Sequence, residues 1–266
     1  MKATKTNAVV HVAPCYHKRL MRDPGPYTPS LSLGEWLKYS LIPARIYARY
    51  LVNKNVRVGE PELRILPEIV PQNKIAVDIG ANKGVYTRIL AGLATHVHAF
   101  EPNPKAFRWL NRALPDNVTA HRLALSNTDG EANLFIPLRG RGYSNQMASM
   151  RVEKSAEPHG IISVQARTLD SCALTNIGFI KIDVEGFEAE VLAGAKGTIQ
   201  NFKPVLLIEI EERHTGRPIR DSIGYIEALG YSAFFLKNDM LHPIADLESD
   251  TSQASAYIYN FIFLPH

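Results

Sequence analysis

The amino-acid sequence predicts an α/β fold with a mainly parallel central sheet, helices on both faces and an antiparallel C-terminal edge. From residue 74 onward, short apolar runs alternate with helical stretches, which is typical of parallel βαβ units. The first apolar run, residues 75–79, contains Asp78 near its end and is followed by Gly80, at the place where open α/β sheets bind ligands. Two further β-rich runs, at residues 231–236 and 257–264, close the chain and are expected to form the antiparallel edge.

The elements of this fold are expected in chain order, from hydrophobic periodicity and turn signals. Strands are expected at residues 75–79, 96–100, 118–125, 179–184 and 205–210, and helices at residues 82–93, 104–114, 188–193 and 222–229. Residues 131–166 are expected to form a less regular insert with β-rich runs at 132–136 and 161–166 and a turn at 139–143.

The N-terminal part differs in composition from the rest, so we expect a basic, Pro-rich arm and helix over residues 1–57 and one catalytic domain over residues 58–266. Residues 1–58 contain ten Lys or Arg against two Asp or Glu, a net charge of +8, while the remainder carries −4. Four prolines among the first 30 residues favour irregular structure.

A helix is expected to begin after Ser32, which can form a capping box with Glu35. One stripe of this helix consists of Leu33, Trp36, Leu37, Ser40 and Leu41, and it is apolar except for Ser40. Beyond Pro43, a second basic stretch at residues 44–52 carries Arg45 and Arg49 one turn apart. This region is expected either to pack on the catalytic domain or a second copy of the chain, or to contact a membrane surface or partner.

The overall composition is that of a soluble globular protein, with 45% hydrophobic and 21% charged residues. Cys15 and Cys172 lie far apart, which indicates neither a disulfide framework nor a zinc site and favours a reducing compartment. We expect no export signal and no transmembrane segment, hence a cytoplasmic location. The modest net charge of +4 makes nucleic acid an unlikely partner, and a homo-oligomer stays open.

The motif with the clearest chemistry is Val-Asp-Ile-Gly-Ala-Asn-Lys-Gly at residues 77–84, where a strand turns into a helix. Gly80 permits a tight turn, and Gly84 is expected to let the backbone approach a ligand closely. Glu101 follows Gly80 by 21 positions and ends the next strand, the position of a carboxylate that binds ribose hydroxyls.

The charge of the loop distinguishes two nucleoside cofactors. A dinucleotide carries an anionic pyrophosphate, which Asp78 would repel, whereas S-adenosylmethionine carries a sulfonium and an ammonium group, which Asp78 attracts. The loop also departs from the dinucleotide pattern G-x-G-x-x-G, because Asn82 and Lys83 occupy it. The expected cofactor is therefore S-adenosyl-L-methionine.

Four acids, Asp78, Glu101, Asp183 and Glu209, stand at or near the carboxyl ends of expected strands. Because these ends share one edge of a parallel sheet, we expect the four side chains to face a single crevice.

The chain resembles the FkbM-type S-adenosylmethionine-dependent methyltransferases over about residues 58–236. The resemblance rests on residues 77–87 (Val-Asp-Ile-Gly-Ala-Asn-Lys-Gly-Val-Tyr-Thr), 99–104 (Ala-Phe-Glu-Pro-Asn-Pro), 124–127 (Ala-Leu-Ser-Asn), 167–170 (Arg-Thr-Leu-Asp) and 179–188 (Phe-Ile-Lys-Ile-Asp-Val-Glu-Gly-Phe-Glu). It implies a Rossmann-like methyltransferase fold and methyl transfer to hydroxyls of sugars, glycans or secondary metabolites. The basic N-terminal arm lies outside it.

The resemblance also implies roles for individual residues. Cofactor contacts are expected from Asp78, Gly80, Asn82, Gly84 and Thr87 around the methionine part, Glu101 on the ribose, Ser126 on the adenine, and Asn103 and Asp183 beside them. Thr87 and Ser126 each have a simpler alternative, as a residue that bonds its own backbone or forms a turn.

Methyl transfer to a hydroxyl needs alignment and a group that accepts the hydroxyl proton. Asp183 is the first candidate base, with cofactor or Lys181 contact as its alternative role, and His214 is the second. Glu185 and Glu211 are expected to bind either substrate hydroxyls or a divalent cation. The acids have no firm ligand spacing, so no metal is assigned. The insert is expected to shape the acceptor pocket, with Arg139, Arg141, Tyr143 and Arg151 hinting at an anionic acceptor.

Two other functions stay open. Amino methylation of nucleic acid usually relies on Asn/Asp-Pro-Pro-aromatic after the fourth strand, whereas this chain has Asp-Val-Glu-Gly at residues 183–186. The other alternative is a non-catalytic nucleoside-binding module that docks on a membrane or partner through the basic arm.

Overall fold

The computed structural model describes residues 29–112, 114–139, 142–144, 147–150, 159–216, 218–247 and 258–266. The expectations for the irregular arm before residue 29, for Cys15, and for the side chains of Arg139, Arg141 and Arg151 lie outside the described residues.

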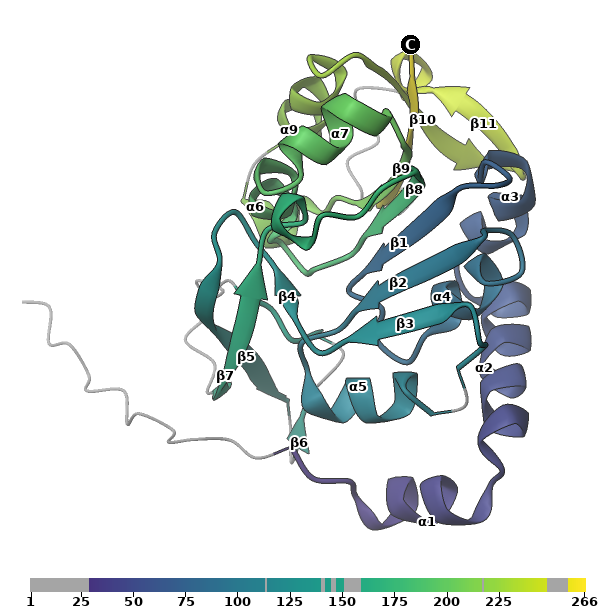
Figure 1. Ribbon diagram of the computed structural model, residues 1–266, viewed down its shortest axis with the longest axis vertical. Helices are drawn as coiled ribbons and strands as arrows, with labels where there is room; N and C mark the ends of the chain where they lie inside the picture. The colour runs from purple at the N-terminus through teal and green to yellow at the C-terminus, as the bar shows by residue number, and fades with distance from the viewer. Residues whose placement is uncertain are drawn as a thin grey trace, which may run out of the picture.

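An eight-stranded sheet forms the centre of the molecule, in the order β11-β10-β12-β9-β8-β1-β2-β3 (Figure 1). The parallel strands are β1 (Ile75–Ile79), β2 (His96–Phe100), β3 (Val118–His121), β8 (Ile177–Ile182) and β9 (Val205–Glu209). The antiparallel strands are β10 (Tyr231–Lys237), β11 (Met240–Pro243) and β12 (Asn260–Pro265). The expected parallel sheet with an antiparallel C-terminal edge is confirmed.

Each face of the sheet buries its own apolar cluster, because successive strand residues point to opposite faces. Val77 and Ile79 join the cluster that includes α6 (Glu188–Ala193), α7 (Lys196–Phe202) and α9 (Ile219–Glu227). Ala76 and Phe179 join the opposite cluster with α3 (Glu62–Ile69) and α4 (Val85–Leu90). The expected helices on both faces are therefore confirmed.

The order of the strands places a topological switch between β1 and β8. The chain runs from β1 outward through β2 and β3, then returns to the other side of β1 and continues through β8 and β9. Loops that leave the carboxyl ends of β1 and β8 diverge in opposite directions, which opens a crevice there. The site described below lies at this crevice.

The expected strand over residues 118–125 is wrong as a single strand. β3 ends at His121, and Ala124 and Leu125 form β4, which pairs with β7 (His159–Arg167) in a second sheet. This sheet has the order β4-β7-β5-β6, with β5 at Gly130–Arg139 and β6 at Gly142–Tyr143. The chain leaves the main sheet between His121 and Ala124 because the backbone of β4 finds its hydrogen-bond partners in β7.

Helix boundaries also differ from the expectation. The helix expected over residues 82–93 begins only at Val85, because Asn82 (φ 50°) and Gly84 (φ 79°) adopt left-handed conformations that no helix accommodates. The helix expected over 104–114 is α5 (Pro104–Leu110). Helices α3 and α7 and the short α8 (Glu212–Thr215) were not expected as helices.

The N-terminal helices are α1 (Leu33–Leu41) and α2 (Ala44–Val58). The expected capping box is confirmed, since Glu35 N donates to Ser32 Oγ (3.3 Å) and Ser32 N donates to Glu35 Oε2 (2.8 Å). Helix α2 packs inward through Tyr47, whose ring lies 4.7 Å from that of Trp109 on α5. The apolar stripe of α1 is exposed within the described part of the chain, rather than packed on the catalytic domain.

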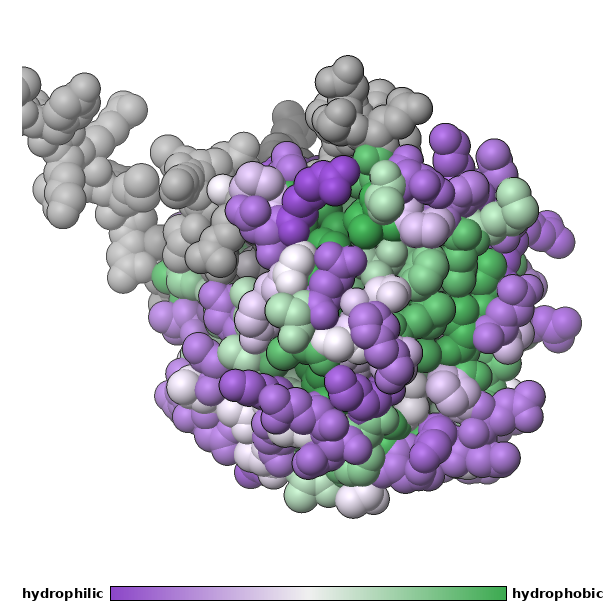
Figure 2. All heavy atoms as spheres, turned by 90° about the horizontal axis from the view of Figure 1, so that it is seen from above, coloured by the Kyte–Doolittle hydropathy of each residue, from purple (hydrophilic) through white to green (hydrophobic). Residues whose placement is uncertain are grey.

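From above, hydrophilic residues form most of the rim of the molecule and hydrophobic residues gather between them (Figure 2). Among the residues that the structure describes, no helix combines the length and apolar character needed to cross a membrane.

Candidate active site

Two adjoining cavities open at the carboxyl ends of β1, β2 and β8. The first has a volume of about 340 Å³ and the second of about 760 Å³. Glu60, Gly80, Asn82 and Asp183 line both cavities, so the loop after β1 separates two parts of one site.

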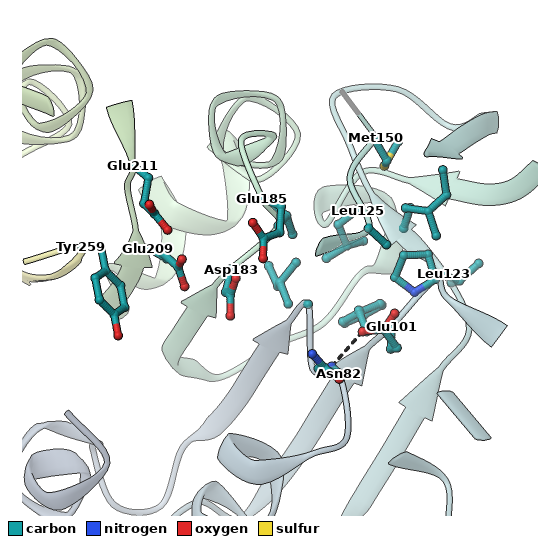
Figure 3. Close-up of a pocket in the computed structure, with 18 of the residues that line it drawn as sticks. Asn82, Glu101, Leu123, Leu125, Met150, Asp183, Glu185, Glu209, Glu211 and Tyr259 are labelled. Atoms are coloured by element: carbon teal, nitrogen blue, oxygen red, sulfur yellow. Dashed lines mark hydrogen bonds between the residues drawn. The ribbon is translucent and has the colours of Figure 1, made fainter. Parts of the chain in front are cut away.

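Glu101, at the end of β2, is held rigidly at one end of the first cavity. Its Oε2 accepts a hydrogen bond from Asn82 N (2.8 Å) and its Oε1 from Asn103 N (2.8 Å), as the dashed line in Figure 3 shows for Asn82. Burial raises the pKa of Glu101 to about 7, although both backbone bonds oppose this shift. Each carboxylate oxygen keeps further acceptor capacity, which suits a pair of vicinal hydroxyls.

Asp78 lies beneath the same loop and is fully buried. Its Oδ2 accepts a hydrogen bond from Thr87 Oγ1 (2.5 Å), whereas its Oδ1 has no hydrogen-bond partner in the described part of the chain. Burial raises the pKa of this carboxyl, against the opposing charge of Lys181. Asp78 lines the second cavity, Glu101 and Glu209 line the first, and Asp183 lines both, so the four acids divide between two adjoining cavities instead of facing a single one.

The two glycines of the loop serve packing. Gly80 has φ 80°, and a Cβ there would overlap the carbonyl oxygen of Asp183, so only glycine lets this loop meet the segment after β8. Gly84 caps α4, and a Cβ there would overlap Arg88 and Leu110. Gly84 therefore approaches neighbouring protein side chains, and the expected approach to a ligand does not explain it.

Three other predicted cofactor residues lie behind the cavity walls. Thr87 orients Asp78, as described above. Asn103 caps α5, since its Oδ1 accepts a hydrogen bond from Lys105 N (2.9 Å). Ser126 follows Leu125, and its backbone N–H donates to Arg167 O (2.8 Å) on β7. Each of these three residues thus supports a neighbouring residue or segment that lines a cavity.

An apolar wall also lines the first cavity and was not expected from the sequence. It consists of Phe100, Leu123, Leu125, Leu134 and Met150. Leu134 and Met150 belong to the insert, and Figure 3 places Met150 at the Glu101 end, away from Glu209 and Tyr259. The insert therefore shapes the half of the pocket next to Glu101.

Polar groups gather at the other end of the first cavity, where Figure 3 shows Glu209, Glu211 and Tyr259. Asp183 lies between these groups and the Glu101 end, with Glu185 beside it. Its Oδ2 forms an ion pair with Lys181 Nζ (2.8 Å).

Lys181 is buried, and its ammonium lies 4.4 Å from the centre of the Tyr86 ring. Burial alone would lower the pKa of Lys181, but the carboxylates of Asp183 and Asp78 outweigh it and raise that pKa. Tyr86 in turn donates from its hydroxyl to Glu60 Oε2 (2.5 Å). A fixed, charged lysine thus stands between the two acids that border the two cavities.

Two glutamates at the polar end hold protons more tightly than usual. Burial, followed by the charges of Asp183 and Glu211, raises the pKa of Glu185 to about 8. Burial and the charge of Asp183 likewise raise the pKa of Glu209. Glu185 adopts a left-handed φ of 54°, and its Oε2 lies 3.3 Å from Nδ1 of His214, whose side chain is buried behind it.

Four residues at or next to the cavities were not expected there from the sequence: Glu60, Lys181, Arg213 and Tyr259. Lys181 lies inside the motif at residues 179–188, within an otherwise apolar strand. A charged residue in a buried strand could have been recognised from the sequence as a candidate site residue. Tyr259 reaches the site because β12 pairs with β9, and Ile210 N donates to Tyr259 O (2.7 Å). Glu60 and Tyr259 come from segments that only tertiary structure brings together.

Comparison with known proteins places this site in a family. The hexuronic acid methyltransferase AglP of Haloferax volcanii is 26% identical over 174 residues, which span 63% of this chain and 67% of that protein. The 2-O-methyltransferase NoeI of Sinorhizobium fredii is 27% identical over 191 residues, 64% of this chain and 78% of that protein. A solved structure of methyltransferase FkbM from Methylobacillus flagellatus KT superposes with a TM-score of 0.46 and 17% identity, and the match covers 86% of this chain and 60% of that one.

A family model also matches this chain. The methyltransferase FkbM domain matches residues 78–233, more than half of the chain, and this range includes Asp78, Glu101 and Asp183. The chain therefore belongs to the FkbM methyltransferase family.

Proposed function

We propose that this chain is an S-adenosylmethionine-dependent O-methyltransferase that acts on a hydroxyl of a sugar or glycan. The observation that carries the proposal is the layout of the first cavity. A fixed carboxylate and an apolar wall occupy one end, carboxyl groups occupy the other, and Asp183 lies between them.

The residues of the site fit the methyl donor. The unpartnered Oδ1 of Asp78 suits an ammonium group, Glu101 suits the ribose hydroxyls, and the wall of Phe100, Leu123 and Leu125 suits an adenine ring. When bound, S-adenosylmethionine supplies an electrophilic methyl group on a sulfonium.

The polar end suits an acceptor with several hydroxyls. Asp183 is the proposed base, because it borders the donor loop and its Oδ2 is oriented by Lys181. Glu185 and Glu209 hold their protons more tightly than ordinary carboxyls, so they can both donate and accept hydrogen bonds to sugar hydroxyls. His214 contacts Glu185 and, in this proposal, positions it.

The named relatives narrow the class of acceptor. AglP is named for a hexuronic acid and NoeI for a 2-O position, so a sugar hydroxyl is the acceptor to test first. The polar end also contains Arg213, whose Nη2 donates to Glu211 Oε1 (2.7 Å). A uronic acid would meet both cationic and carboxyl groups there, so uronic acids and neutral hexoses form the first acceptor panel.

Calorimetry and turnover test the proposal together. We expect S-adenosylhomocysteine to bind and NAD to give no heat, and we expect transfer of a labelled methyl group to at least one sugar of the panel. Asp183→Asn should lower kcat at least about a hundredfold while the Kd for S-adenosylhomocysteine changes little. The matched control is Asp116→Asn, an exposed aspartate on a turn.

Binding of NAD without S-adenosylhomocysteine would overturn the donor assignment. Full turnover in Asp183→Asn would remove Asp183 from the base role. Tight donor binding without transfer to any sugar of the panel would favour a non-catalytic module.

A further inference from the structure

The N-terminal helices expose an unusual share of apolar surface. Seven of the nine large hydrophobic side chains that are exposed in the described part of the chain lie on α1 and α2. On α1 these are Leu33, Trp36, Leu37 and Leu41, with exposed fractions between 40% and 75%. They are the apolar stripe of the sequence, turned away from the protein.

Helix α2 also exposes a stripe, and this one is both apolar and basic. Its exposed residues Ile46, Arg49, Tyr50, Lys54, Arg57 and Val58 follow the three- and four-residue spacing of one helix face, and they line one shallow groove. Helix α2 contains four Lys or Arg and no acidic residue in its 15 residues. We call the exposed stripes of α1 and α2 the α1–α2 face.

The opposite sides of both helices already hold them on the protein. Glu35 of α1 pairs with Lys105 (2.9 Å), and Tyr39 packs edge-on against Trp109 at 5.2 Å. Ala48 of α2 is buried, and Val56 packs on the cluster of α3 and α4. The α1–α2 face therefore takes no part in the contacts that anchor the two helices on the protein.

We propose that the α1–α2 face docks on an anionic lipid bilayer. Leucine and tryptophan side chains next to arginine and lysine are the combination that interfacial helices use, with apolar groups among the acyl chains and cations at anionic headgroups. In Figure 1, α1 lies along the bottom of the molecule and α2 rises from it at the right, joined by Ile42 and Pro43.

The charges and apolar side chains of the α1–α2 face favour a bilayer over two other binding partners, a second copy of the chain and a nucleic acid. A second copy that met the groove of α2 about a twofold axis would bring Arg49, Lys54 and Arg57 against their own counterparts with no acid to compensate. A nucleic acid would match the cations but would leave Leu33, Trp36 and Leu41 in water. Of these three occupants, the anionic bilayer is the one that satisfies both the charges and the apolar side chains.

The α1–α2 face adjoins the site. Ile46, Tyr50 and Lys54 line both the groove of α2 and the second cavity, which reaches Asp78 and Asp183. When the protein is docked on a bilayer, the mouth of this cavity would thus lie close to the lipid headgroups. If the proposed function holds, a sugar acceptor anchored to lipid would be presented there.

Vesicle co-sedimentation of the full chain tests the docking without any donor or acceptor, so its result does not depend on the proposed function. We expect the protein to pellet with vesicles of phosphatidylglycerol and phosphatidylcholine, and to stay in the supernatant with phosphatidylcholine alone. Added salt should weaken binding, because screening reduces attraction between the cations and the headgroups.

Charge reversal provides the matched comparison. Arg49→Glu/Arg57→Glu should reduce the partition coefficient for phosphatidylglycerol vesicles more than about tenfold, while Lys196→Glu/Lys237→Glu, which reverses two exposed cations elsewhere, should reduce it far less. Both variants should keep the far-ultraviolet circular dichroism of the unaltered protein, which checks folding. Equal losses in the two variants would show general charge attraction and overturn the proposal.

Tryptophan emission gives a second readout, because the chain has only two tryptophans. Trp36 is 53% exposed, whereas Trp109 is buried. We expect phosphatidylglycerol vesicles to shift the emission to shorter wavelength in the unaltered protein and not in Trp36→Phe. Failure to bind these vesicles, equal binding to both vesicle types, or an unshifted Trp36 would each overturn the proposal, as would a dimer that Ile46→Asp dissociates.

Discussion

At the scale of single residues, Glu101 depends on two backbone donors for its position. Asn82 N and Asn103 N each donate to a different carboxylate oxygen, so both oxygens must be acceptors. In Glu101→Gln, the amide nitrogen would face one of these N–H groups, and two donors would oppose each other. We expect the Kd for S-adenosylhomocysteine to rise at least about tenfold, measured by calorimetry.

The control for this prediction is Glu131→Gln, which makes the same change at an exposed position of β5. An unchanged Kd in Glu101→Gln would mean that Glu101 does not bind the donor and serves only to hold the loop.

A second prediction concerns the buried pair of Asp78 and Thr87. Thr87→Val keeps the shape of the side chain but removes the hydroxyl that donates to Asp78 Oδ2, and Asp78 Oδ1 already has no partner in the described part of the chain. A buried carboxyl without a donor should cost about 1–3 kcal/mol of unfolding free energy, measured by urea denaturation.

The exposed Thr128→Val should stay within about 0.5 kcal/mol of the unaltered protein, because it removes no buried hydrogen bond. An equally small effect in Thr87→Val would indicate that water satisfies Asp78.

The sequence could predict the acids at strand ends because strand-end position follows from apolar runs alone. Asp78, Glu101 and Asp183 all border the cavities for this reason. It could not separate residues that line a cavity from residues that support the lining. Gly84, Asn103 and Ser126 were predicted to contact the cofactor, but they contact residues next to the cavities and do not line them. Nor could it find Glu60 and Tyr259, which approach the site through the packing of distant segments.

At the scale of elements, the central strands were predictable because each is a buried apolar run between polar turns. The errors arose where backbone conformation or pairing overrides such runs. Asn82 and Gly84 delay α4 through left-handed conformations, and Ala124 leaves the main sheet to pair with Ala166. Neither effect has a signal in hydrophobic periodicity.

The third prediction concerns α7, which is held at its start by a residue from another element. Asp170 Oδ2 accepts a hydrogen bond from Gly197 N (2.8 Å), and its Oδ1 accepts from Thr198 N (2.7 Å) and Thr198 Oγ1 (2.7 Å). Asp170→Ala leaves these N–H groups at the start of α7 without an acceptor. The variant should lose about 1–2 kcal/mol in urea denaturation.

Asp116→Ala is the control for α7, because Asp116 is exposed on a turn. A loss as large in Asp116→Ala would show that charge alone, rather than the cap, accounts for the effect.

At the scale of the whole molecule, buried carboxyls make folding sensitive to pH. Burial raises the pKa of Glu62 and of Glu188 to about 7, and that of Glu185 to about 8. Each of these groups binds a proton more tightly in the folded chain than in the unfolded chain. As the pH rises, the unfolded chain releases these protons first, so each group makes the free energy of unfolding fall with increasing pH.

Glu62 offers the clearest test of this linkage, because it lies on α3 outside the proposed contacts with donor and acceptor. Its ordinary pKa is 4.5, so its contribution is fully present below pH 4.5 and is lost as the pH rises to about 7. Glu62→Gln removes the proton equilibrium, and its amide oxygen can still accept from Asn260 Nδ2, which lies 3.3 Å from Glu62 Oε2. Relative to the unaltered protein, the variant should therefore gain about 3 kcal/mol of unfolding free energy between pH 4.5 and pH 7.5, measured by urea denaturation at each pH. Glu68→Gln, at an exposed position of the same helix, should show no such gain, and a constant difference between Glu62→Gln and the unaltered protein across this range would refute the raised pKa.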